Sequence, residues 1–281
     1  MFWNRFKTVI FLTTLSALLL VAGQAIGGTT GLHFAVIFAL VMNFGSYFFA
    51  DKIVLKMYSA QPLDEHKYKY VHEMVEELCD RANLPKPKLW LIPSNIANAF
   101  ATGRNPKHSS VAVTEGILNM LDESELQGVL AHELSHVKNR DILISTIAAT
   151  IAMAIGYIAS MLRWSLIFGG KNRNSNGIGA IATIILMPIA ATLIQFAISR
   201  SREFMADETG AKISQNPLGL ASALRKISDG PKVQPSSQAM MATENMFIIN
   251  PFSKKGFIKL FSTHPPTEDR IARLEKMVHQ L

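Results

Sequence analysis

Apolar side chains are concentrated in four long stretches of this sequence, which run approximately over Thr8–Ile26, His33–Ala50, Ile142–Leu162 and Ile178–Ser199. A helix needs about 20 consecutive apolar residues to cross the hydrocarbon core of a bilayer. Each stretch is long enough to do so. The members of each pair follow one another closely, so the pattern predicts two hydrophobic hairpins, at residues 1–50 and 142–199.

Basic residues flank the first hairpin on one side only. Arg5 and Lys7 precede its first stretch, Lys52 and Lys56 follow its second, and the connection at 27–32 contains neither lysine nor arginine. Because cytoplasmic loops are enriched in these residues, we expect both ends of the hairpin in the cytoplasm. The first stretch is longer than the core of a signal peptide and a second follows at once, so we interpret the pair as a retained anchor.

The second hairpin is less regular. Its connecting loop contains Arg163, Lys171 and Arg173, which the same charge rule would keep in the cytoplasm. Pro188 also interrupts its second stretch. We therefore expect this hairpin to be tilted or only partly inserted.

The segments outside the hairpins have the periodicity of a folded domain. Apolar residues recur at helical spacing in Leu63–Ala82, and KLWLI and SSVAVT are typical of short strands, with NAFATGR forming a strand or turn between them. Helices are predicted for SRSREFMADETGAKI, for Lys212–Ile227 with a break near Asn216–Pro217, and for Thr267–Val278. The fold class is therefore a mainly α membrane protein with a small β-sheet.

Composition agrees with a membrane location and removes other classes. The 281 residues are 49% hydrophobic and only 17% charged. The net charge is +7, but the basic residues are dispersed and often flank apolar stretches, so we attribute them to the membrane surface and expect no nucleic acid partner. Cys79 is the only cysteine, which excludes an intrachain disulfide and a cysteine-based zinc ribbon.

The segment AHELSH places His132 and His136 one helical turn apart. Its helix is predicted to begin at Asp122, where Asp122 and Glu125 form a capping-box pattern. Residues i and i+4 share one face of a helix, so both imidazoles can bind one ion with Glu133 beside them. A zinc ion with three protein ligands keeps a position for water, whose proton Glu133 would take. The alternative is two surface histidines on an amphipathic helix.

A catalytic zinc site needs a third protein ligand. The extended signature with a third histidine does not continue, because Asn139 and Ile142 occupy the positions of its glycine and histidine. The best candidate is Glu203 in SRSREFMAD. Asp207 lies one turn further along the same predicted helix, where its carboxylate can accept the N–H of a ligating imidazole. Alternatively, Glu203 is solvated or forms a surface ion pair with Arg200 or Arg202.

Three segments, HELSHVKNRD, SRSREFMAD and STHPPTEDRI, occur in this order between the hydrophobic stretches. Together they resemble the HtpX family of membrane-bound zinc metalloproteases, which are relatives of the CAAX prenyl proteases. The resemblance covers nearly the whole chain. It implies one zinc ion per chain, with ligands His132, His136 and Glu203, the catalytic base Glu133, and Asp207 as hydrogen-bond partner of a ligand.

The resemblance also implies roles for three further residues. His264 and Arg270 match the late motif and would steady the oxyanion of the tetrahedral intermediate or bind the substrate backbone. Without the resemblance, His264 is a helix-entry residue before two prolines and Arg270 is a surface charge paired with a neighbouring acid. Asn98, in NIANAFATG, matches a position along the active-site cleft, where a substrate would be held as an added strand; otherwise it caps a turn.

The sequence as a whole predicts a gluzincin-like zinc endopeptidase. Its catalytic domain consists of residues 51–141 and 200–281, interrupted by the second hairpin. The resemblance implies polypeptide substrates, namely misfolded or membrane proteins in protein quality control. We expect a multi-pass protein of the bacterial inner membrane with its site facing the cytoplasm. The alternatives are a prenyl-protein protease, which needs a larger intramembrane chamber, and a non-catalytic scaffold or metal sensor.

Overall fold

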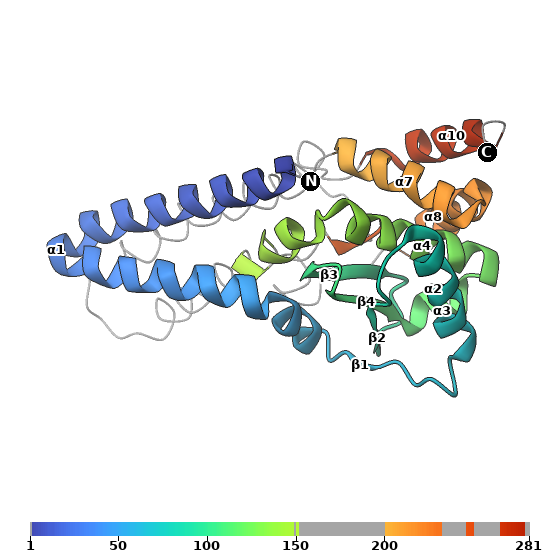
Figure 1. Ribbon diagram of the computed structural model, residues 1–281, viewed down its shortest axis with the longest axis horizontal. Helices are drawn as coiled ribbons and strands as arrows, with labels where there is room; N and C mark the ends of the chain where they lie inside the picture. Colours follow the sequence, from blue (N-terminus) through green and yellow to red (C-terminus); the bar gives the residue numbers. More distant parts are fainter. Residues whose placement is uncertain (1, 149, 152–199, 232–245, 250–264, 279–281) are drawn as a thin grey trace.

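A computed structural model describes residues 2–148, 150–151, 200–231, 246–249 and 265–278 (Figure 1). Of the second predicted hairpin it includes 142–148, 150 and 151, which are helical. The rest of that hairpin lies outside the described residues.

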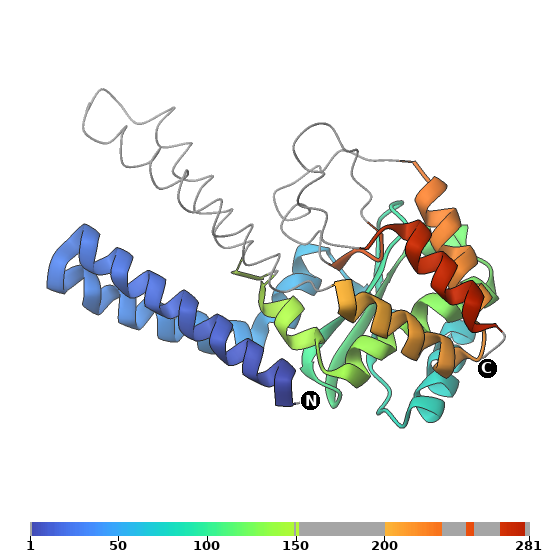
Figure 2. The same cartoon turned by 90° about the horizontal axis from the view of Figure 1, so that it is seen from above.

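The N-terminal helix α1 (Phe2–Met57) is a hairpin of two antiparallel arms that projects from the rest of the protein (Figures 1 and 2). The arms meet at Gly28, whose φ of 59° and ψ of −143° interrupt the helix. They approach so closely that a Cβ added to Gly31 would lie 2.2 Å from the carbonyl oxygen of Gly23. The Asn43 amide also donates to the Ser16 hydroxyl across the arms (2.9 Å). Small residues and polar side chains hold helices together in lipid in this way.

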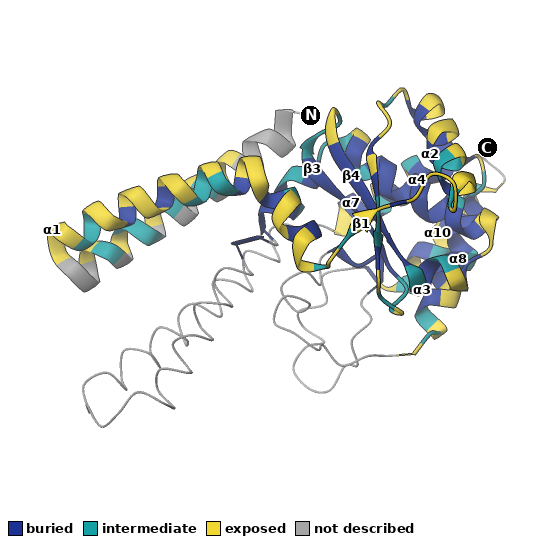
Figure 3. Cartoon of the chain, turned by 90° about the horizontal axis from the view of Figure 1, so that it is seen from below, coloured by how far each residue is buried: buried dark blue, intermediate teal, exposed yellow. Residues whose placement is uncertain are grey.

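Among the described residues, one helical arm, Gly28–Met57, is both long and apolar enough to cross a membrane. Much of this arm is exposed, as the yellow colouring in Figure 3 shows, and large apolar residues are among the exposed ones: Phe34 is 71% exposed and Phe44 is 66% exposed. Exposed apolar patches of this size mark a surface that is covered in the cell.

The sheet has four strands in the order β1-β2-β4-β3: β1 (Gln61–Pro62), β2 (Lys88–Ile92), β4 (His108–Thr114) and β3 (Ala99–Asn105). β2 and β4 are parallel, whereas the other two pairs are antiparallel. The predicted strands KLWLI and SSVAVT are confirmed, and NAFATGR supplies most of the third. β3 forms one edge of the sheet.

The first helix of the domain, α2 (Lys69–Ala82), is shorter than the predicted Leu63–Ala82. Leu63 instead extends the sheet, since its N–H donates to the carbonyl of Leu89 (3.0 Å). Asp64 then accepts the N–H groups of His66 and Lys67 in a turn. The prediction was wrong at this end because a local aspartate turn competes with helix.

The remaining helices are α3 (Glu115–Met120), α4 (Glu123–Asn139), α7 (Arg200–Ser214), α8 (Pro217–Asp229) and α10 (Thr267–Met277). The predicted break near Asn216–Pro217 is confirmed. Gln215 adopts a left-handed φ of 57°, and the Asn216 side chain accepts the N–H of Gly219 (3.0 Å) to cap α8.

Helix α4 lies between the sheet and the later helices α7 and α8, and its buried apolar residues form the centre of one hydrophobic core (Figure 1). That core includes residues from both sides of the second predicted hairpin. Glycines bring the helices together: a Cβ on Gly128 would lie 2.4 Å from the backbone nitrogen of Leu220, and one on Gly210 would lie 2.9 Å from that of His132. The opposite face of the sheet contacts the end of α1 through Val54 and Phe100.

We expect Gly210→Ala to destabilise the folded protein by roughly 1–3 kcal/mol, because the new methyl group overlaps the α4 backbone. Without this contact, the same change within a helix would stabilise by up to about 1 kcal/mol. Urea denaturation in detergent measures the difference. Glu208→Ala, an exposed neighbour on α7, is the control and should change stability by less than about 0.5 kcal/mol. A stabilised Gly210→Ala would contradict the close packing of α4 and α7.

Candidate metal centre

Helix α4 is fixed at both ends. The Asp122 side chain accepts the N–H of Glu125 (2.9 Å) and the Glu125 carboxylate accepts that of Asp122 (3.0 Å), so the predicted capping box is confirmed. Glu125 also accepts hydrogen bonds from Ser222 and Lys226 of α8 (2.6 and 2.7 Å). At its other end α4 stops at Arg140, which takes a left-handed φ of 56°. The polar face of the helix is therefore held in a single position.

His132 and His136 turn their Nε2 atoms toward each other on that face, 3.2 Å apart. Glu203 approaches from α7, and its two carboxylate oxygens lie 3.8 Å from these nitrogens, one oxygen to each. The three side chains that the sequence singled out as ligands thus lie together, although Glu203 is distant from the histidines in the chain. One ligand atom from each lies within 4.8 Å of the others.

This donor set fits a tetrahedral metal site. Zinc–nitrogen and zinc–oxygen bonds of about 2.0–2.2 Å put neighbouring ligand atoms roughly 3.4 Å apart. The observed separations of 3.2 and 3.8 Å bracket that value. Two imidazoles and one carboxylate leave a fourth position open, as in catalytic sites.

The second nitrogen of each imidazole faces a carboxylate. His132 Nδ1 lies 2.9 Å from Asp207, which the sequence predicted, and His136 Nδ1 lies 3.1 Å from Asp141, which it did not. Such contacts fix the tautomer and leave Nε2 available for a metal. The left-handed Arg140 turns Asp141 back toward His136. An acidic residue just beyond the helix end was the available signal.

Arg270 of α10 is buried behind this pair. Its Nε and Nη2 atoms donate to both oxygens of Asp207 (2.8 and 2.7 Å), and Nη1 donates to the carbonyl of Ile248 (2.8 Å). Burial disfavours the charge of Asp207, but the Arg270 guanidinium outweighs it and lowers the pKa of Asp207 to about 2. The pKa of Arg270 is raised in turn, since Asp207 overcomes its burial. The surface pairing considered for Arg270 is wrong, because this side chain is only 1% exposed.

Glu133 points toward the edge strand β3. Its Oε2 accepts the N–H of Ala101 (2.8 Å), and the residue is 5% exposed. Burial raises the pKa of Glu133, while the nearby imidazoles of His132 and His136 act in the opposite direction. A carboxyl group with a raised pKa both takes up and returns a proton more readily near neutral pH.

Asn98 and His264 are the two other residues predicted for the site. The Asn98 amide faces the segment 246–249: its Oδ1 accepts the N–H of Ile248 (3.2 Å) and its Nδ2 donates to the carbonyl of Met246 (3.4 Å). His264 lies outside the described residues. The roles assigned to both from the sequence stay predictions.

Arg202 is a charged residue of the site that sequence reasoning considered only as a surface partner. It is 7% exposed, and its Nη1 atom has no hydrogen-bond partner among the described residues. Burial lowers the pKa of Arg202, although the charges of Asp141 and Glu203 oppose this shift. Its proximity to these carboxylates places a second buried cation beside the cluster.

A model of peptidase family M48 matches residues 65–278 of this sequence. The chain belongs to peptidase family M48. A protease HtpX homolog of Sulfurihydrogenibium sp. is 52% identical over 99% of this chain and 97% of its own, and that of Aquifex aeolicus is 52% identical over 95% and 90%. The predicted HtpX membership is confirmed, and with it the class of membrane-associated metalloprotease.

The crystal structure of Ste24p from S. mikatae has a similar fold, with a TM-score of 0.50 over 98% of this chain and 67% of that chain. The two sequences are 17% identical, so this likeness concerns the fold alone.

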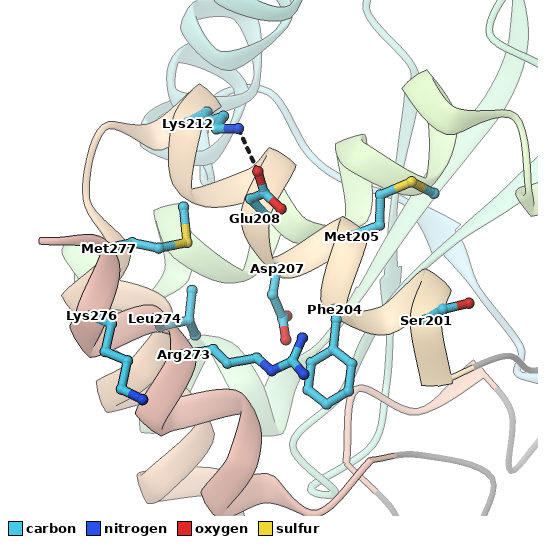
Figure 4. A pocket seen from close by; sticks show the side chains of 10 residues that line it. All are labelled: Ser201, Phe204, Met205, Asp207, Glu208, Lys212, Arg273, Leu274, Lys276 and Met277. Atoms are coloured by element: carbon cyan, nitrogen blue, oxygen red, sulfur yellow. Dashed lines mark hydrogen bonds and ion pairs between the residues drawn. The ribbon is translucent and has the colours of Figure 1, made fainter. Parts of the chain in front are cut away.

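A hollow of about 880 Å³ lies between α7 and α10 (Figure 4). Of the residues described above around the proposed metal ligands, only Asp207 lines it. Its wall includes Phe204, whose ring lies 3.7 Å from the Arg273 guanidinium carbon. Neither imidazole lines it, and neither does Glu133. The hollow is therefore distinct from the place where a peptide bond would meet the proposed ligands.

The contact between His136 and Asp141 makes the stability of the metal-free protein depend on pH. Burial opposes the charge of His136, but Asp141 outweighs it and raises the pKa of His136 from 6.5 to about 10. Stability from a raised pKa is complete below the unfolded value and lost as the pH rises through the folded one. The melting temperature of chelator-treated protein should therefore fall between pH 6.5 and 10. Asp141→Asn should flatten this fall, and identical slopes for both proteins would contradict the assignment.

Asp141→Asn should also weaken metal binding by roughly 10–100-fold, because the ligating imidazole loses the carboxylate that orients it. Competition between the purified protein and a chromophoric chelator for zinc measures the affinity. Asp269→Asn is the control, since Asp269 is exposed and neighbours Arg270 in the sequence. Equal affinities for the parent and Asp141→Asn would remove Asp141 from the site.

Proposed function

We propose that this chain is a membrane-anchored zinc endopeptidase that cleaves misfolded or membrane-inserted polypeptides in protein quality control. The observation that carries the proposal is the convergence of two imidazoles from α4 and one carboxylate from α7 beside Glu133. The proposed roles are zinc ligation by His132, His136 and Glu203, proton transfer by Glu133, and orientation of the histidines by Asp207 and Asp141.

A zinc ion at this position would supply Lewis-acid activation of water and polarisation of the scissile carbonyl group. The protein supplies the remaining steps. Glu133, whose pKa is raised by burial, accepts the proton of the attacking water and returns it to the leaving amine nitrogen. Its hydrogen bond to the Ala101 N–H holds the carboxylate at one place during both transfers.

The edge strand β3 is the proposed binding surface for the substrate backbone. Ala101 donates to Glu133, away from β4, and backbone groups alternate along a strand, so Ala99 directs its N–H to the same edge. A peptide added there would lie beside the base, with specificity that tolerates varied side chains. Asn98, at the start of β3, already pairs with backbone groups of 246–249, and we propose that it makes the same contacts with a substrate.

We assign Arg270 a positioning role in place of direct contact with the oxyanion. Its donors are directed at Asp207 and the carbonyl of Ile248, and its Nη1 atom also lies 3.8 Å from Oε2 of Glu203. Its charge therefore acts on the site through Asp207 and Glu203. His264, implied by the resemblance, keeps the proposed oxyanion role.

We further propose a multi-pass protein of the bacterial inner membrane whose site faces the cytoplasm. The hairpins would be residues 1–50 and 142–199, and the catalytic domain residues 51–141 and 200–281. The apolar arm Gly28–Met57 and the basic Lys52 and Lys56 at its end support this orientation. The shared core of the two domain parts supports their placement on one side.

Glu133→Gln should lower casein cleavage by roughly 10²–10⁴-fold, the usual contribution of a general base, while the variant still binds zinc. Cleavage by purified protein in detergent and metal content measure the two effects. Glu203→Gln should lose both activity and zinc.

Glu208→Ala, the exposed neighbour on α7, should change neither property. A parent protein that binds zinc without cleaving casein would favour the scaffold or metal sensor. Unchanged zinc affinity in Glu203→Gln would remove Glu203 from the ligand set.

A further inference from the structure

A second hollow, of about 620 Å³, lies where the second arm of α1, Gly28–Met57, passes β3. None of the proposed metal ligands lines it. Its apolar wall is formed by five residues of α1, namely Val41, Phe44, Gly45, Phe48 and Phe49. Two cations, Lys52 of α1 and Arg104 of β3, also line it. We refer to these seven residues as the α1–β3 hollow.

Arg104 is directed to this hollow by a β-bulge. The register between β3 and β4 shifts between Gly103 and Asn105, so Arg104 falls at the irregularity. Gly103 has a φ of 135°, and a Cβ there would lie 2.2 Å from the carbonyl oxygen of His108, so the bulge requires glycine. Bulges commonly redirect a side chain in this way. The Arg104 guanidinium carbon lies 5.2 Å from the Phe48 ring centroid.

Within the part of the chain that the structure describes, Lys52 and Arg104 form no ion pair with an acidic side chain. Lys52 instead lies 5.7 Å from the centroid of Phe49. The hollow therefore combines an apolar wall with two positive charges at one end, which is complementary to an amphiphile with an anionic head.

The position along α1 identifies which amphiphile is available. The residues from Gly28 to Lys52 span about 36 Å of helix, slightly more than the roughly 30 Å hydrocarbon core. Lys52 thus reaches the level of the lipid phosphates when Gly28 lies at the opposite surface. Aromatic residues followed by Lys or Arg are typical of this interface. The exposed aromatic residues of α1, among them Phe44 and Phe48, lie on the same stretch.

We propose that the α1–β3 hollow binds an anionic phospholipid of the cytoplasmic leaflet. The acyl chain would pack on Val41, Phe44 and Phe48, and the phosphate would lie between Lys52 and Arg104. This inference rests on the membrane insertion of α1 in the proposed function. Because Arg104 belongs to β3, the bound lipid holds the proposed substrate edge at the membrane surface.

The test uses the full-length protein in phosphatidylcholine nanodiscs with and without phosphatidylglycerol, and native mass spectrometry counts the lipid retained. The parent should retain phosphatidylglycerol in preference to phosphatidylcholine. The double variant Lys52→Gln/Arg104→Gln should lose this preference by roughly 5- to 30-fold, since each cation near an anionic surface contributes about a factor of five.

Two further variants make the result specific. Lys56→Gln/Lys107→Gln removes two exposed charges nearby and should keep the preference. Gly45→Phe fills the hollow without removing charge, because nothing lies within 4 Å of a Cβ at Gly45; it should lower retention of phosphatidylglycerol. Equal loss in the Lys56/Lys107 control would overturn the site in favour of general surface charge.

Membrane insertion and casein cleavage in detergent are measured on the same proteins. A parent that floats with vesicles and cleaves casein but shows no preference for phosphatidylglycerol would overturn the lipid site and leave the proposed function intact. A parent that cleaves casein but does not float would overturn the lipid site together with the membrane anchor. Loss of cleavage would count against the proposed function, while a retained lipid preference would still support the site.

Discussion

The neutralisation of buried charge is the constraint on which this site depends. Four carboxyl groups and two guanidinium groups are buried around the imidazoles, from Glu133, Asp141, Glu203, Asp207, Arg202 and Arg270. When all are ionised, they carry two negative charges in excess, which a divalent cation at the Nε2 atoms would balance. Unpaired buried charges are strongly destabilising, so the fold is compatible with these residues only as a complete set.

This constraint explains why the Nδ1 atom of each histidine faces a carboxylate. Arg270 fixes Asp207 through both of its oxygens, Asp207 fixes His132, and Asp141 fixes His136. A metal that binds a preoriented pair of imidazoles does not have to order them itself. The close contact of Gly210 with the α4 backbone completes the arrangement, because it brings α7 near enough for Glu203 to face both rings.

How well the sequence predicted each contact depends on whether its partners belong to one helix or to different elements. The pairing of His132 with His136 is set by helical periodicity, so a single segment was sufficient. Glu203 and Asp207 were identified from spacing and family resemblance, but their contacts depend on the packing of α7 against α4. Asp141 was missed because its position requires a left-handed Arg140, which the residue types do not predict. The burial of Arg270 was missed for a similar reason, since its partner comes from another helix.

β3 connects the chemistry to the membrane. Ala101 donates to the proposed base, while Arg104, three residues later, faces the apolar arm of α1. The end of α1 contacts the sheet through a packed apolar cluster that includes Val54 and Phe100. Close packing of this kind fixes the position of the sheet relative to the end of α1. If α1 inserts as proposed, the depth of insertion would set the height of the proposed substrate edge above the bilayer. In the proposed function, a substrate segment that emerges from the membrane beside α1 would therefore reach this edge directly.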